Sequence, residues 1–162
     1  MKRDLSFGSL LTTITASLIA MFVSISPAFW SLASSMNARG EVAHPEFLIG
    51  AVGCVLLIVC GLVAIILAII GIFKRGKGLA IATMVFQGLL FVGALLAFIG
   101  GLNLCAGIDP EELIIYGLQW VLPFVALILA YAGAFVLNLF NVLKMKKQTP
   151  IVEAENKEEV VA

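Results

Sequence analysis

Four long apolar stretches that contain no Asp, Glu, Lys, Arg or His constrain this chain more than any other feature. They cover about residues 7–33, 48–73, 79–104 and 113–143. A helix needs roughly 20 apolar residues to cross a hydrocarbon core of about 30 Å, and each stretch is long enough. Hydrophobic residues make up 62% of the chain and charged residues 12%, against roughly 45–50% and 25% in soluble domains. We therefore predict an all-α integral membrane protein, a four-helix bundle with four transmembrane spans.

The placement of basic residues predicts the orientation of these spans. Eight Lys and Arg residues lie before span one, between spans two and three, and directly after span four, whereas the other two connections hold only Arg39. Short loops rich in Lys and Arg stay in the cytoplasm, so both termini are predicted to be cytoplasmic. Pro45 and Pro110 each precede an acidic residue at the start of a span. Proline and acidic side chains favour the first turn of a helix, which supports the same span boundaries.

The first span has a second interpretation. Lys2 and Arg3 followed by an apolar run, with small residues around Ser31, Leu32 and Ala33, could form a cleavable signal peptide. The apolar run has about 25 residues, whereas a signal peptide has roughly 7–15 in its apolar region. We therefore expect the first span to be retained as a membrane helix.

The chain divides into a membrane domain and a tail. Residues 1–147 form the predicted four-helix domain, and the composition changes after Lys147 to QTPIVEAENKEEVVA, which contains four glutamates. A segment with few apolar and many charged residues buries too little surface to fold alone. Residues 148–162 are therefore predicted to be an acidic, disordered cytoplasmic tail.

Small residues at steps of four predict where the helices pack. In lipid, helices associate by close packing, which small side chains permit. Each span contains such a stripe, and the predicted packing residues are Ala16, Ala20, Ser24, Ala64, Ala68, Gly93, Ala97, Gly101, Ala126, Ala130 and Ala134. The stripes predict a compact bundle. Pro123, within span four, is expected to bend its helix, because proline removes a backbone hydrogen bond.

The polar residues inside the spans are neutral, and Gln87 and Tyr131 are predicted to be the most deeply buried of them. We expect these two side chains to form hydrogen bonds between helices. The single histidine, His44, lies in a loop beside Glu46 and lacks the further ligands of a metal site. No nucleophile–base combination or phosphate-binding loop is recognisable. We expect no catalytic residues, no metal, no cofactor and no nucleic-acid partner, so the chain is predicted not to be an enzyme.

One segment resembles a known family. The link between spans two and three reads GIFKRGKGLAIA, which resembles the centre of small bacterial two-helix membrane domains of unknown function. The resemblance covers about residues 48–101, and Thr83 stands where those domains usually have glycine. It implies a bacterial membrane hairpin, and it implies no activity or functional residues. We expect the chain to be a multi-pass protein of the cell membrane, the inner membrane of a bacterium.

These observations favour a non-enzymatic accessory, scaffolding or self-associating subunit that acts through helix–helix contacts. Its expected partners are the lipid bilayer and either further copies of itself or another membrane protein. A small oligomeric channel or transporter for a neutral solute is the first alternative, because the spans contain only neutral polar groups. A membrane sensor that signals through the cytoplasmic tail is the second.

Overall fold

The computed structural model describes residues 5–36, 39–74, 76–106 and 110–161, which are almost entirely helical. In chain order the elements are α1 (Leu5–Ser35), the short 3-10 helix η1 (Pro45–Phe47), α2 (Leu48–Phe73), α3 (Lys77–Cys105), α4 (Pro110–Tyr116), the π-helix η2 (Gly117–Val121) and α5 (Leu122–Val161). Within these described residues the only β-type pairing is an isolated bridge between Met36 and Val42. The predicted all-α four-helix bundle is confirmed.

Four helical segments are long and apolar enough to cross a membrane. They are Phe7–Ser35, Pro45–Phe73, Lys77–Cys105 and Ile114–Lys144. The fourth combines the end of α4, all of η2 and the first part of α5. The chain is thus a multi-pass membrane protein by the length and composition of its helices, whereas the identity of the membrane and the side on which the termini lie remain predictions.

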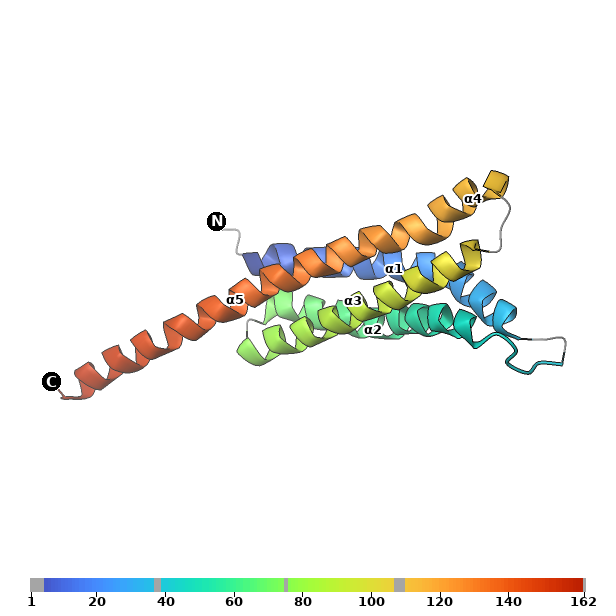
Figure 1. Ribbon diagram of the computed structural model, residues 1–162. Coiled ribbons are helices and arrows are strands. Elements are labelled where there is room, and N and C mark those ends of the chain that lie inside the picture. The colour runs from blue at the N-terminus through green and yellow to red at the C-terminus, as the bar shows by residue number, and fades with distance from the viewer. Residues whose placement is uncertain (1–4, 37–38, 75, 107–109, 162) are drawn as a thin grey trace.

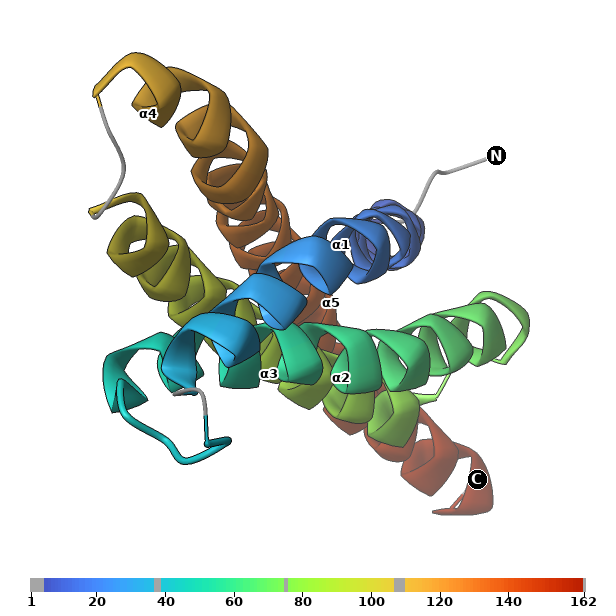
Figure 2. The ribbon, with the colours of Figure 1, turned by 90° about the vertical axis from the view of Figure 1, so that its right-hand side faces the viewer.

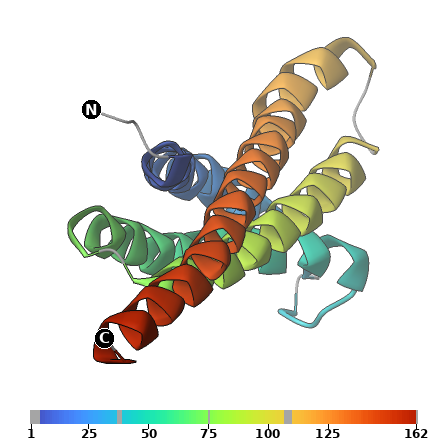
Figure 3. The ribbon, with the colours of Figure 1, turned by 90° about the vertical axis from the view of Figure 1, so that its left-hand side faces the viewer.

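The helices form a ring in which each packs against the next. α1 packs against α2, α2 against α3, α3 against α5, and α5 against α1. We call the end with the start of α1 and the α2–α3 link the proximal end, and the end with α4 the distal end (Figure 1). Viewed along the bundle, the helices cross and spread apart towards their ends (Figures 2 and 3).

All four helices bury positions that alternate by four and three residues. The average period is about 3.5 residues. This is the period of helices that pack side chains of one helix, as knobs, into holes between side chains of the next. The buried positions that follow this alternation are Thr13, Ser17, Ala20, Ser24, Pro27 and Ser31 on α1; Gly50, Cys54, Leu57, Gly61, Ala64 and Ala68 on α2; Thr83, Gln87, Leu90, Ala94, Ala97 and Gly101 on α3; and Trp120, Phe124, Leu127, Tyr131, Ala134 and Asn138 on η2 and α5. The fourth face has the largest side chains, which fill space beside the small residues of the others.

Glycines bring α2 and α3 into backbone contact. A Cβ atom added to Gly50 would lie 2.9 Å from the Cα atom of Gly100, and one added to Gly100 would overlap Gly50 itself. A Cβ atom on Gly53 would lie 2.7 Å from the carbonyl oxygen of Gly93 and would overlap the backbone of Ala97. No residue larger than glycine fits at Gly50, Gly53 or Gly100 without separating the two helices.

The π-helix η2 lies directly before Pro123. Leu122 donates its backbone N–H to the carbonyl of Gly117, five residues earlier, which is the π-type bond. Pro123 has no N–H, and its ring would clash with the carbonyl four residues before it in a regular α-helix. The wider turn accommodates that clash, so Pro123 is associated with a local π-helix in the fourth span.

The helical backbone continues through the segment for which disorder is predicted. α5 runs to Val161, and its last part extends beyond the other helices (Figure 1). Glu, the most frequent residue in this segment, has high intrinsic helix propensity. In the structure, the backbone of the tail up to Val161 thus continues the helix of the fourth span.

Candidate functional site

The buried face of α1 is made largely of hydroxyl groups. Ser9, Thr13, Ser17, Ser24, Ser31 and Ser35 are all at most 1% exposed. A hydroxyl within a helix can donate to a carbonyl of the preceding turn, as Thr13 Oγ1 does to the carbonyl of Ser9 at 2.8 Å. Small hydroxyl side chains thus allow close packing, and Thr13 remains hydrogen-bonded, whereas Ser24 Oγ is buried without a hydrogen-bond partner. The side of α1 that faces the bundle is more polar than the side with Phe22 and Phe29, which is exposed.

Gln87 connects α3 to two of these hydroxyls. Its Nε2 donates to Thr13 Oγ1 at 2.7 Å and to Ser9 Oγ at 3.1 Å. Ser9 Oγ in turn donates to the carbonyl of Ala134 on α5 at 2.8 Å. Because each hydroxyl has a backbone acceptor for its own proton, both can accept from the amide.

Asn138 completes this network from α5. Its Nδ2 donates to Gln87 Oε1 at 3.3 Å and to the carbonyl of Ala80 at 3.1 Å. We call Ser9, Thr13, Gln87 and Asn138 the proximal polar cluster. It joins α1, α3 and α5 by neutral hydrogen bonds, which fixes how these three helices are positioned along one another.

Tyr131 makes a weaker contact near the middle of the bundle. The ring is fully buried, and its hydroxyl donates to Ser17 Oγ over 3.4 Å. Tyr131 and Gln87, the two residues predicted to be the deepest polar groups, are both fully buried and both reach α1.

Aromatic side chains gather at the distal end. The rings of Tyr116 and Trp120 have centroids 4.8 Å apart, and those of Trp30 and Trp120 are 6.4 Å apart. Phe29 lies edge-on to Trp30 at 6.4 Å. We call these four residues the distal aromatic cluster. The Nε1 atom of Trp120 is buried and has no hydrogen-bond partner.

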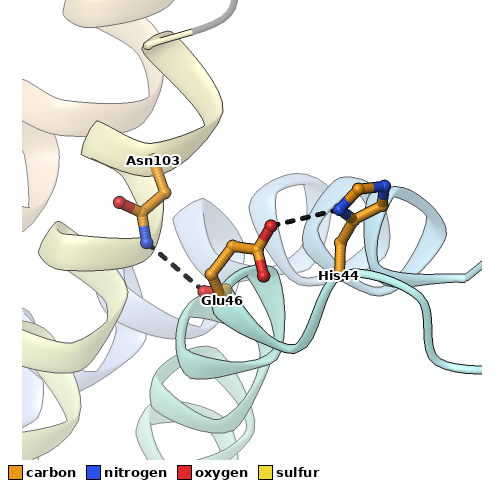
Figure 4. Close-up of polar contacts among 3 residues, drawn as sticks. All are labelled: His44, Glu46 and Asn103. Carbon is orange, nitrogen blue, oxygen red and sulfur yellow. Dashed lines mark hydrogen bonds and ion pairs between the residues drawn. The ribbon is translucent and has the colours of Figure 1, made fainter.

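Three polar residues form contacts at the distal end of α2 and α3 (Figure 4). Asn103 Nδ2 on α3 donates to the backbone carbonyl of Glu46 at 3.3 Å, and Glu46 Oε1 lies 3.1 Å from His44 Nδ1. The His44 and Glu46 side chains are both more than half exposed. This arrangement ties the start of α2 to the end of α3, and it offers a metal only one imidazole and one carboxylate.

Most predicted packing residues lie on the buried faces. Ala16, Ala20, Ser24, Ala64, Ala68, Gly93, Ala97, Gly101 and Ala134 are buried, and Ala130 packs against the edge of the core. Ala126 is exposed and faces outward. Successive steps of four residues rotate a helical stripe by about 40° each, so the stripe from Ala126 to Ala134 moves across the helix surface. The buried face instead alternates steps of four and three.

Several residues that shape the core were not among the predicted sites. They include Gly50, Gly53 and Gly100 at the α2–α3 crossing, and the hydroxyls Ser9 and Thr13 that bind Gln87. The exposed face of α5 also alternates steps of four and three, so this spacing by itself does not distinguish Thr13 or Gly50 as buried. Gly100 needs the tertiary structure, because only its approach to Gly50 distinguishes it.

The described residues provide little reactive chemistry. Cys54, Cys60 and Cys105 are free and buried. Among the residues that the structure describes, no three His, Cys, Asp or Glu side chains are grouped so that they could hold a metal ion.

Comparison of the chain with models of protein families, with curated proteins and with solved structures found no match.

Proposed function

We propose that this protein is a non-enzymatic accessory or scaffolding subunit that acts through contacts of its membrane helices. The observation that carries the proposal is the proximal polar cluster, in which Gln87 and Asn138 satisfy groups on three helices without any charged residue. Such a core favours one bundle geometry over others. Its two hydroxyls, of Ser9 and Thr13, are bonded to backbone carbonyls and to an amide rather than to a general base, which supports a non-catalytic role. A bundle of this kind presents its outer surface in a fixed arrangement.

The surface available to a partner is the outward one. Gly93, Ala97 and Gly101 contact other helices of the same chain, so they are not free for association. On α5 an outward face repeats at steps of four and three, through Leu122, Ala126, Leu129, Gly133, Val136 and Phe140. Ala126 and Gly133 leave room for another helix to approach closely. We therefore place the partner contact on this face of α5.

Substitution of Gly133 tests this placement with a matched control. A Cβ atom at Gly133 on α5 or at Gly88 on α3 would have no atom within 4 Å, so the fold should tolerate Gly133→Leu and Gly88→Leu equally. The protein would be isolated from membranes in mild detergent, its oligomeric state measured by native mass spectrometry and its co-purifying proteins identified.

We expect Gly133→Leu to reduce the bound partner severalfold and Gly88→Leu to leave it unchanged. A wild-type protein that is monomeric and carries no partner in stoichiometric amount would contradict the proposed function. Equal effects of the two variants would contradict only the assigned surface.

The hydroxyl-rich face of α1 favours one second candidate, an oligomeric channel or transporter for a neutral solute. A row of neutral donors and acceptors from Ser9 to Ser35 could replace the hydration of such a solute. Flux of small neutral solutes into liposomes, measured for wild type and for Gln87→Leu, distinguishes the two candidates. Liposomes that remain impermeable would exclude the channel and leave the scaffold proposal intact.

A further inference from the structure

The distal end of the bundle contains a hydrogen-bond donor that the protein does not use. Trp120 is 7% exposed, and its indole Nε1 has no partner. The amide of Gln87, by contrast, is bonded to two hydroxyls. An unpaired N–H in a low-dielectric interior is unfavourable, and buried polar groups are nearly always paired. The unpaired Nε1 therefore points to an acceptor that comes from outside the chain.

The surroundings of Trp120 indicate the chemistry of that acceptor. The rings of Tyr116 and Trp30 lie against it, with centroids 4.8 Å and 6.4 Å away. The outer flank is apolar, because Ile114, Leu118 and Phe29 are all more than half exposed. The described faces of this cluster thus place the buried, unpaired N–H of Trp120 beside aromatic and aliphatic surface. Such a site suits a neutral oxygen atom attached to an apolar chain.

We propose that the distal aromatic cluster binds a membrane lipid, whose ester carbonyl oxygen accepts a hydrogen bond from Trp120 Nε1. The cluster lies near the ends of the spans formed by α1 and by η2 with α5, where indole and phenol rings meet the boundary between hydrocarbon and headgroups. Ester carbonyls lie at that boundary with the acyl chain directed inward. The chain would then lie along Ile114 and Leu118.

Access to Nε1 requires a local rearrangement, and the structure provides the means. Trp30 is 51% exposed and Tyr116 is partly exposed, so either ring can turn outward without breaking the core below it. Trp120 itself belongs to η2, and π-helical turns within α-helices are frequent at functional sites. Opening therefore involves the rings of the cluster and leaves the proximal polar cluster unchanged.

The test uses the fact that the chain contains two tryptophans. Trp30→Phe leaves Trp120 as the only indole, and ultraviolet resonance Raman spectra then report hydrogen bonding of its N–H directly. The full-length variant would be studied in nanodiscs of a diester phosphatidylcholine and of the matching diether lipid, which has the same chains but no carbonyl, and also in detergent.

We expect the indole N–H to be hydrogen-bonded in the diester nanodiscs and unbonded in the diether nanodiscs and in detergent. An N–H that is unbonded in all three media would overturn the proposal. An N–H bonded equally in diester and diether lipid, or in detergent, would also overturn it, because the acceptor would then be water, a second copy of the chain or another group.

Lipid retention in native mass spectrometry provides a second readout. Loss of one hydrogen bond should weaken lipid binding about fivefold, so Trp120→Phe should retain clearly less diester lipid than the wild type. Equal retention by Trp120→Phe and the wild type would count against the proposed bond. The spectra of Trp30→Phe decide the proposal even if Trp120→Phe does not fold.

Discussion

Gln87 Nε2 on α3 donates a 2.7 Å hydrogen bond to Thr13 Oγ1 on α1, and the two residues are 74 positions apart in the chain. The bond joins helices that lie diagonally across the bundle and share few other contacts. Because Thr13 gives its own proton to the carbonyl of Ser9 at 2.8 Å, it can only accept from Gln87. The direction of the bond follows from the local helix geometry of α1.

Replacement of Gln87 by Leu should destabilise the bundle modestly. Thr13 and Ser9 keep their backbone acceptors, and Asn138 keeps the carbonyl of Ala80, so few groups lose every partner. Hydrogen bonds between membrane helices contribute about 0.6 kcal/mol on average and at most about 1.7 kcal/mol. We expect a loss of about 1–2 kcal/mol in unfolding free energy, measured by steric trapping in bicelles. Gln119→Leu, at an exposed position of η2, is the control and should have little effect.

Gly100→Ala adds only one methyl group, but we expect it to destabilise the protein strongly. The added Cβ atom would overlap the backbone of Gly50, so α2 and α3 must separate. Overpacking of this kind costs about 1–3 kcal/mol. Gly88→Ala, which meets no atom within 4 Å, should instead be neutral or stabilising by up to about 1 kcal/mol, because alanine favours a helix. Similar unfolding midpoints for the two variants would show that the close approach at Gly100 is not important.

The ring of Tyr131 should matter more than its hydroxyl. The hydroxyl bond to Ser17 is long at 3.4 Å, and Tyr131→Phe should cost less than about 1 kcal/mol. Tyr131→Ala would leave a cavity among Ala and Leu side chains and should cost about 3–5 kcal/mol, by analogy with other large aromatic truncations. Both values are measurable by the same unfolding assay. A large loss on Tyr131→Phe would instead indicate that the hydroxyl has a role beyond packing.

Cysteine labelling tests the predicted orientation. In a variant whose three native cysteines are replaced by serine or alanine, an impermeant maleimide applied to intact cells should label Val42→Cys and not Lys74→Cys. Both positions are exposed, and they lie at opposite ends of the bundle. The reverse pattern would show that the basic residues do not face the cytoplasm.

The intact mass of the same protein tests whether the first span is retained, and a value near 17.2 kDa is expected for the uncleaved chain. A mass reduced by the first 30 or so residues would show that the segment is cleaved. Retention is expected because Ser9, Thr13 and Ser17 of α1 supply hydrogen-bond partners for Gln87 and Tyr131.

The amino-acid sequence alone determined the class of this protein and the number of its long apolar helices. Uninterrupted apolar stretches cannot be covered by so few polar residues in water, and backbone groups in lipid must be satisfied within a helix. The predicted second span, 48–73, therefore has the same bounds as α2. These conclusions depend on composition and on hydrogen bonding within a helix, which are local properties of the chain.

Only the tertiary structure decided which face of each helix turns inward. In a soluble helix the polar side marks the surface, but here both sides are compatible with burial, and the more polar side of α1 is the inner one. Gly50 and Gly100 look like the other glycines until α2 and α3 cross at them, and Ala126 looks like Ala134 until α5 is placed against its neighbours. The partners of Gln87 lie 74 and 78 residues away. Such pairings depend on how the helices are arranged in space. The residue pattern of a single helix carries no information about that arrangement.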